Sequence, residues 1–324
     1  MSLIVQKFGG SSLADCDKLL HISHIVKTAY ETGNDVLVVV SAQGDLTDRL
    51  IRRAREVSPR PPLRELDALL AVGEQASAAL TAMALREQGV PAVSLTAHQL
   101  PIRTDGVHGD AAITGVGRAR LERELSLRHV PVVTGFQGID KENDLTTLGR
   151  GGSDYSAVAL SAELGAARCL IYTDVDGVYT ADPRICPTAK RLVRVSYDDM
   201  YALSRAGAQV LHDKCVALAQ ERGVEPEVCS AASGAAGTRI CAAGEGRDVA
   251  GVTCRPGAED GTAEVTLVGR ALPSLALQKR AVLALADAGI AVRGVSAGKH
   301  VLMLTVARGA SEAAVRAVHD AVIA

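Results

Sequence analysis

Residues 146–154, with the sequence TTLGRGGSD, combine glycines, small hydroxyl residues and an arginine where an irregular segment turns into a helix. Small residues let the main chain approach an anion closely. The following helix, expected from Gly152 to about Glu163, presents unpaired N–H groups at the positive end of its dipole. The segment is therefore suited to holding a phosphate group.

A second glycine turn lies near the beginning of the chain, in Lys7-Phe-Gly-Gly-Ser-Ser12, between the apolar run Leu3–Val5 and an amphipathic stretch at 13–32. Two strand-to-helix glycine turns, one with a cation, predict a clamp for nucleotide phosphates. Lys7 precedes its glycine pair, which argues against a Walker A loop. Neither turn has the G-x-G-x-x-G spacing, so a nicotinamide enzyme has little support.

Several polar residues near these turns have two interpretations. Lys7 is either a phosphate partner or a surface cation beside a turn, and the adjacent glycines favour the phosphate partner. Ser41 ends the apolar run Val36–Val40, and Thr47 opens the next helix. Both hydroxyl groups suit ordinary helix capping, and both equally suit a ligand at the carboxyl ends of parallel strands.

Glu74 lies in an otherwise small and apolar helical segment, so it faces solvent or meets a cation such as a substrate ammonium group. Arg150 is placed where a guanidinium group could grip a carboxylate with two hydrogen bonds. Asp154 is either a favourable first-turn acid or an acid that orients the groups beside the phosphate. The acids, tyrosines and arginine of the loop Tyr172–Arg184 suit either plain turns or a nucleoside site.

The composition describes a globular α/β protein: the chain has 324 residues, 48% of them hydrophobic, and a formal net charge of -2. That near balance gives no electrostatic footprint for nucleic acid or for an anionic membrane, so neither is an expected partner. The seven cysteines, without a C-x-x-C pair, fit a reducing compartment. Without a signal-like segment or an apolar run of roughly 20 residues, we expect a cytoplasmic protein.

Alternating apolar runs and helical patterns predict a largely parallel sheet covered on both faces, a three-layer α/β/α domain. The predicted strands are Leu3–Val5, Val36–Val40, Ala92–Leu95, Val130–Val133 and Leu170–Tyr172. The predicted helices are 13–32, 45–57, 64–88, 114–128 and 153–164.

Glycine, alanine and serine accumulate at 231–248, which predicts a linker. After it we expect a small α+β domain with strands at 249–254, 263–268, 290–295 and 301–306 and helices at 275–288 and 311–322. Burial is marginal in a unit of that size, so packing against a second copy would help, and we expect a homodimer there.

With these segments in place, the chain resembles aspartate kinase of the amino acid kinase family over essentially its full length. The resemblance rests on a series of blocks in the family order: 7–12 (KFGGSS), 40–48 (VSAQGDLTD), 72–75 (VGEQ), 103–105 (RTD), 134–138 (TGFQG), 146–154 and 172–184. It implies an amino-acid kinase catalytic domain at 1–242 and a single ACT-like regulatory or oligomerisation domain at 243–324.

The resemblance implies transfer of the γ-phosphoryl group of Mg-ATP to the β-carboxylate of L-aspartate, in the biosynthesis of lysine, threonine or methionine. Mg²⁺ would be held mainly through the nucleotide phosphates, without a dedicated protein site. The implied catalytic residues are Lys7 and Asp154. The implied substrate-binding residues are Ser41, Thr47, Glu74 for the α-ammonium group, Arg150 for the α-carboxylate, and Ser153. The implied ATP-binding residues are Lys7, Gly9, Gly10, Ser11, Thr173, Asp174, Tyr179, Asp182 and Arg184.

Two features depart from the family pattern. Gln209 stands where relatives usually have a lysine that contacts ATP. The C-terminal region has room for one ACT module, completed by the strand at 249–254, where relatives usually carry two, so we expect weak or no feedback inhibition by lysine or threonine. The alternatives are a kinase for another small carboxylate amino acid and a non-catalytic amino-acid sensor, which would be expected to have lost Lys7, Arg150 or Asp154.

Overall fold

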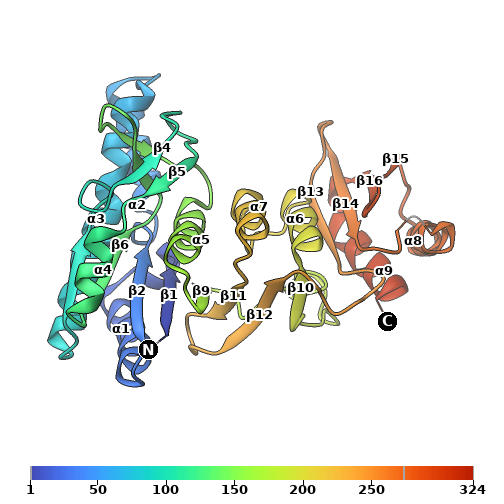
Figure 1. Ribbon diagram of the computed structural model, residues 1–324. Helices are drawn as coiled ribbons and strands as arrows, with labels where there is room; N and C mark the ends of the chain where they lie inside the picture. The colour runs from blue at the N-terminus through green and yellow to red at the C-terminus, as the bar shows by residue number, and fades with distance from the viewer. Residues whose placement is uncertain (1, 273, 324) are drawn as a thin grey trace. The chain divides into compact units, whose positions relative to one another are not determined.

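The computed structural model describes residues 2–272 and 274–323. Contacts divide the chain into two compact units, Met1–Asp176 with Leu218–Ala236, and Gly177–Ala217 with Gly237–Ala324. The elements of both are labelled in Figure 1.

The first unit is built on a parallel sheet whose strands lie in the order β11-β9-β1-β2-β6-β3. Their bounds are β1 Leu3–Phe8, β2 Asp35–Val40, β3 Ala92–Leu95, β6 Val130–Thr134, β9 Arg168–Thr173 and β11 Pro226–Ser230. All residues of β2 from Val36 to Val40 are buried, as expected of a strand covered on both faces. The predicted central strands and the mixed α/β class are confirmed.

Helices cover both faces of this sheet. Their bounds are α1 Cys16–Glu31, α2 Leu46–Val57, α3 Leu63–Glu87, α4 Ala119–Ser126 and α5 Gly152–Leu164. One apolar core joins β1 and β2 to α1 and α3, with Phe8, Ile22 and Leu85 fully buried in it. The opposite face carries α5, which Figure 1 shows across β1 and β9, and whose residues from Gly152 to Ser161 are all buried.

Helix α3 positions one part of the site. Pro61 and Pro62 precede it, where their fixed φ is compatible with a helix start, and it ends before Gly89, whose φ is +82°. Among the described residues, α3 is long and apolar enough to cross a membrane by length and composition alone, although charged residues interrupt its apolar run. Its buried Leu70, Ala78 and Leu85 show the packing of a core helix.

A second, four-stranded sheet in the first unit has the order β5-β4-β7-β8. Its strands are β4 Ile102–Thr104, β5 Ile113–Val116, β7 Gln137–Ile139 and β8 Leu145–Thr147. The predicted helix at 114–128 is wrong in its first part, because Ile113–Val116 pairs with β4 as a strand and the helix begins only at Ala119. Antiparallel pairing with Ile102–Thr104 satisfies backbone groups that a helix would have used.

The second unit contains a parallel strand pair, β10 Arg194–Ser196 with β12 Ala236–Cys241, and the helices α6 Tyr197–Arg205 and, at its boundary, α7 Asp213–Arg222. The predicted linker at 231–248 is therefore wrong in its middle, where Ala236–Cys241 forms a strand. Its small residues permit close pairing with β10 as readily as they permit a loop.

The same unit holds a four-stranded antiparallel sheet in the order β13-β14-β16-β15. The bounds are β13 Gly251–Pro256, β14 Thr262–Val268, β15 Gly294–Ala297, β16 Val301–Ala307, α8 Leu275–Asp287 and α9 Ser311–Val322. Four strands and two helices were predicted here, with the first strand supplied from the N-terminal side, and this arrangement is confirmed. The strand predicted at 290–295 begins later, at Gly294.

Candidate active site

A cavity of about 590 Å³ lies in the first unit, where β1, β2 and β6 end. Ligands bind at the carboxyl ends of the strands in open α/β sheets. The cavity brings together eight residues that were predicted to bind substrates or to act in catalysis: Lys7, Gly10, Ser41, Thr47, Glu74, Arg150, Ser153 and Asp154.

Lys7 and Asp154 form an ion pair at one side of the cavity. Lys7 is the next-to-last residue of β1, and Asp154 lies in the first turn of α5, where the helix dipole favours an acid. Lys7 Nζ lies 2.6 Å from Asp154 Oδ1, and the two residues are only 7% and 8% exposed. A buried cation is thereby held at a strand end, where it can meet a phosphoryl group.

The glycine turn after β1 is pressed against the turn after β2. A Cβ atom on Gly10 would lie 2.5 Å from the carbonyl oxygen of Ala42, so only glycine fits. The Gly44 N–H donates to the Gly10 carbonyl at 2.9 Å. The Gly9 N–H donates to the Tyr172 carbonyl, so this predicted phosphate donor is already engaged. Gly10 lines the cavity, whereas Ser11 is exposed beside it.

Glu74 is buried, with 2% of its surface exposed, and its two carboxylate oxygens differ. Oε1 accepts a hydrogen bond from the Ala42 N–H at 2.9 Å, while Oε2 has no hydrogen-bond partner among the described residues. Burial raises the pKa of Glu74 from 4.5 to about 7. Charged groups are rarely buried without a counter-charge, so an unpaired Oε2 on a residue that lines the cavity indicates a place for a cationic ligand group.

Gly73 permits the contact between Glu74 and the turn after β2. A Cβ atom at this position would lie 2.7 Å from the Ala42 Cβ, which is closer than side chains approach one another. The absence of a side chain lets α3 approach Ala42 closely enough for the Glu74 hydrogen bond.

Arg150 is exposed at the cavity, between Gly149 and Gly151, whose φ values of +75° and +68° favour glycine. No carboxylate of residues 2–272 or 274–323 forms an ion pair with its guanidinium group. Arg150 can therefore bind a ligand carboxylate with two hydrogen bonds. Ser153, in the first turn of α5, and the hydroxyl residues Ser41 and Thr47 complete the lining.

The predicted nucleoside residues fall in both units. Thr173 ends β9 and its hydroxyl donates to Asp174 at 3.1 Å, in the first unit. Tyr179, Asp182 and Arg184 lie in the second unit. There the guanidinium group of Arg184 lies 2.7 Å from Asp182 and holds the pKa of that carboxyl below its ordinary value. Gln209, in the same unit, is exposed.

Sequence reasoning missed several residues that line the cavity, above all Asp67, Gly109, Phe136 and Thr147. Phe136 adopts a φ of +67°, which is uncommon for a residue with a side chain and occurs at functional sites. The available signal for Asp67 was its spacing: it lies seven residues before Glu74, two helical turns, and so on the same face of α3.

In the described part of the second unit, Cys186, His319 and Asp320 lie close enough together to hold a metal ion. The Thr188 hydroxyl lies 3.2 Å from Cys186 Sγ, 3.4 Å from His319 Nδ1 and 2.7 Å from Asp320 Oδ1. This hydroxyl group therefore lies within hydrogen-bond distance of all three side chains.

The amino acid kinase family model matches residues 2–230. Two curated aspartokinases, from Bacillus sp. (strain MGA3) and Geobacillus stearothermophilus, are 47% and 46% identical to this chain over 240 residues. The matched segment covers 74% of this chain and 58% or 59% of the relative, so the chain spans less than two thirds of the length of these proteins.

Two solved structures share the fold. E. coli aspartokinase III in complex with aspartate and ADP matches with a TM-score of 0.85 and 22% sequence identity, covering 99% of this chain and 100% of that one. Aspartate kinase from Synechocystis matches with a TM-score of 0.69 and 29% identity, covering 99% of this chain and 69% of that one.

Proposed function

The chain belongs to the amino acid kinase family, and from this premise we propose that it is an aspartate kinase. It transfers the γ-phosphoryl group of Mg-ATP to the β-carboxylate of L-aspartate and forms 4-phospho-L-aspartate and ADP. The curated relatives at 46–47% identity are named aspartokinases, which supports this substrate within the family.

The observation that carries the proposal is the unpaired Oε2 atom of buried Glu74, in the same cavity as the exposed guanidinium group of Arg150. An α-amino acid carries an ammonium group and a carboxylate on one carbon atom, and these charges are complementary to Glu74 and Arg150. Ser41, Thr47 and Ser153 offer hydroxyl groups to the rest of the substrate.

The reaction needs positioning and charge neutralisation rather than a general base. The β-carboxylate is already ionised, so its oxygen attacks the γ-phosphorus atom while the bond to the β,γ-bridging oxygen breaks and ADP leaves. Lys7 offers a positive charge to the transferring group, and Asp154 holds Lys7 in place. The Gly10 turn and the start of α5 face the phosphates.

The site fits a nucleotide that brings its own magnesium ion. Mg²⁺ keeps oxygen ligands and is commonly bound through substrate phosphates with one or two carboxylates. Asp154, the carboxylate next to Lys7, is already paired with it at 2.6 Å. When bound, Mg²⁺ would neutralise phosphate charge. For the nucleoside we propose Thr173, Asp174, Tyr179, Asp182 and Arg184.

For the domain organisation we propose a catalytic domain at 1–242 and an ACT-like domain at 243–324 that forms a homodimer, in a cytoplasmic enzyme. The antiparallel sheet β13-β14-β16-β15 with two helices supports the ACT-like assignment. Leu275 of α8 is 79% exposed and Val295 of β15 is 56% exposed, which supports a covering partner. Weak feedback inhibition stays a prediction, tested by titrating turnover with lysine.

The direct test measures ADP release by the purified protein with Mg-ATP and L-aspartate, glutamate, N-acetylglutamate or no acceptor. Hydroxylamine traps the acyl phosphate as a hydroxamate. We expect ADP release and hydroxamate formation that depend on L-aspartate. Turnover with a different acceptor would contradict the assigned substrate, and no turnover with any acceptor would favour a sensor.

A further inference from the structure

Helix α3 carries two buried acids on one face. Asp67 is 1% exposed and Glu74 is 2% exposed, and the seven residues between them correspond to two helical turns. Glu74 faces the turn after β2, whereas Asp67 faces the small sheet β5-β4-β7-β8. The proposed reaction gives Asp67 no role.

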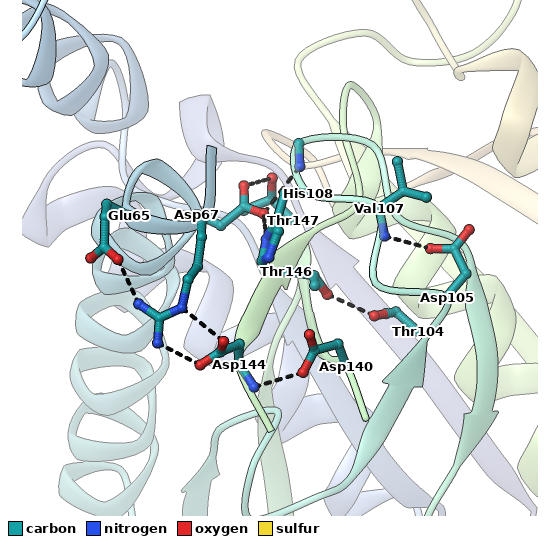
Figure 2. A network of polar contacts seen from close by, with 12 residues as sticks. Glu65, Asp67, Thr104, Asp105, Val107, His108, Asp140, Asp144, Thr146 and Thr147 are labelled. Carbon is teal, nitrogen blue, oxygen red and sulfur yellow. Dashed lines mark hydrogen bonds and ion pairs between the residues drawn. The ribbon is translucent and has the colours of Figure 1, made fainter. Parts of the chain in front are cut away.

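The carboxylate of Asp67 accepts three hydrogen bonds, two of which come from side chains (Figure 2). The Thr147 hydroxyl donates to Oδ1 at 2.6 Å. His108 Nδ1 and the Gly109 N–H lie 2.8 Å and 3.0 Å from Oδ2 and donate to it. A carboxylate only accepts, so three donors of this kind suit its ionised form.

These donors belong to the segments that border the Arg150 side of the cavity. Thr147 is the last residue of β8, three residues before Arg150. Its carbonyl accepts from the Ala111 N–H at 2.9 Å, which ties the loop of His108 to the same strand end. Beyond Thr147 the chain passes Gly149, whose φ of +75° favours glycine, and reaches Arg150. Asp67 therefore holds, through buried hydrogen bonds, the point where β8 ends and the turn that contains Arg150 begins.

We propose that Asp67 is a positioning residue that sets the separation between Glu74 and Arg150, and thereby the affinity for the amino acid substrate. Glu74 lies on the same helix as Asp67, and Asp67 holds the end of β8 that leads to Arg150. The helix and this strand end together fix the distance between the groups that bind the substrate ammonium and carboxylate. This inference rests on the proposed function, because it takes those two groups as the substrate contacts.

A second contact at the same junction serves as an internal control. Arg64, one helical turn before Asp67, binds Asp144 of the β7–β8 turn through two hydrogen bonds of 2.7 Å and 2.6 Å. Its side chain is 51% exposed. Ion pairs in solvent contribute little, so this contact joins the same two elements without fixing them firmly.

The experiment compares Asp67→Ala, Asp67→Asn, Thr147→Val and Arg64→Ala in steady-state kinetics. We expect Asp67→Ala to raise the KM for L-aspartate about tenfold, because both substrate contacts remain but their separation changes, with the KM for ATP and kcat within about twofold of wild type. Thr147→Val should shift the aspartate KM in the same direction by less. Asp67→Asn keeps an acceptor for His108 and Gly109 and can donate to Thr147, so it should largely rescue binding. Arg64→Ala should leave all three parameters unchanged.

The wild-type protein is assayed first, because a lack of aspartate-dependent turnover refutes the proposed function. Wild-type turnover together with an unchanged aspartate KM in Asp67→Ala refutes the positioning role alone. Equal losses for aspartate and ATP would also refute it, since they would indicate a general loss of structure. If Asp67→Ala does not fold, Thr147→Val carries the same test, because it keeps the carboxylate and its other two donors.

Discussion

Two buried acids of the cavity are held in opposite ways. Asp154 pairs with a cation of the chain itself, Lys7, at 2.6 Å. Glu74 has only the Ala42 N–H on one oxygen, and its other oxygen has no partner within the described residues. The acid at the phosphoryl end of the cavity thus has a counter-charge before a ligand arrives, and the acid at the amino-acid end has none. The comparison teaches that an unpaired buried charge marks the sign of the missing ligand group.

The largest effect on turnover should come from removing the cation at the phosphoryl end of the cavity. Lys7→Met keeps much of the side-chain volume and removes the charge that faces the transferring phosphoryl group. We expect kcat to fall about 10²–10³-fold, as for the loss of one electrostatic group that acts on a transition state. Hydroxamate formation measures kcat. Lys18→Met in α1, where the side chain is 54% exposed, is the matched control. A loss smaller than about tenfold would contradict the role of Lys7.

The unpaired acid at the amino-acid end, Glu74, should make the free energy of unfolding depend on pH. The folded-state pKa of Glu74 is raised from 4.5 to about 7, so between these values the folded protein binds a proton that the unfolded chain has released. The free energy of unfolding therefore falls as pH rises through this window, by about 3 kcal/mol. Glu74→Gln lacks this loss. The free energy of unfolding of the variant minus that of wild type should therefore be greater at pH 8 than at pH 4.5.

Denaturant unfolding at pH 4.5, 6 and 8 measures this difference in the absence of aspartate. Glu65→Gln, on the same helix with a 63% exposed side chain, is the control and should follow the wild-type curve. A Glu74→Gln curve parallel to wild type across this range would mean that Glu74 is not held in the folded protein with a raised pKa.

A smaller effect should follow from shifting Glu74 at the amino-acid end of the cavity. Gly73→Ala places a Cβ 2.7 Å from the Ala42 Cβ, so α3 must shift away from the turn that binds Glu74. We expect the KM for L-aspartate to rise about fivefold and the KM for ATP to stay unchanged, since overpacking costs about 1 kcal/mol or more. Gly115→Ala, where a Cβ would meet open space, is the control. Equal changes for both substrates would argue against a local shift.

Five strands of the parallel sheet could be predicted because each contains a short apolar run such as Val36–Val40. The sixth, β11, was missed because its sequence, PEVCS, has no such run. The small sheet could not be predicted: its strands β4, β7 and β8 have three residues each, too few for a period to be recognised. Ile113–Val116 was read as part of a helix for the same reason. Its strand conformation depends on pairing with β4, a contact that no local pattern reports.

The residues of the site also differ in whether a local sequence pattern indicates them. Lys7, Arg150 and Asp154 could be predicted because each lies beside glycines in a turn of recognisable chemistry. The role of Asp67 could not, because its three donors lie 41, 42 and 80 residues further along the chain. The two interpretations of Glu74 could be separated only by its burial and by the environment of each oxygen.

The most direct test of the account is calorimetric binding of L-aspartate and of succinate, which lacks only the ammonium group, at pH 8. The account predicts that the wild-type protein prefers L-aspartate by roughly 100-fold, the value of a charge-assisted contact, and that Glu74→Gln loses most of this preference by weakening L-aspartate alone. Equal discrimination in the two proteins would show that Glu74 does not bind the substrate ammonium group, and would contradict the central claim.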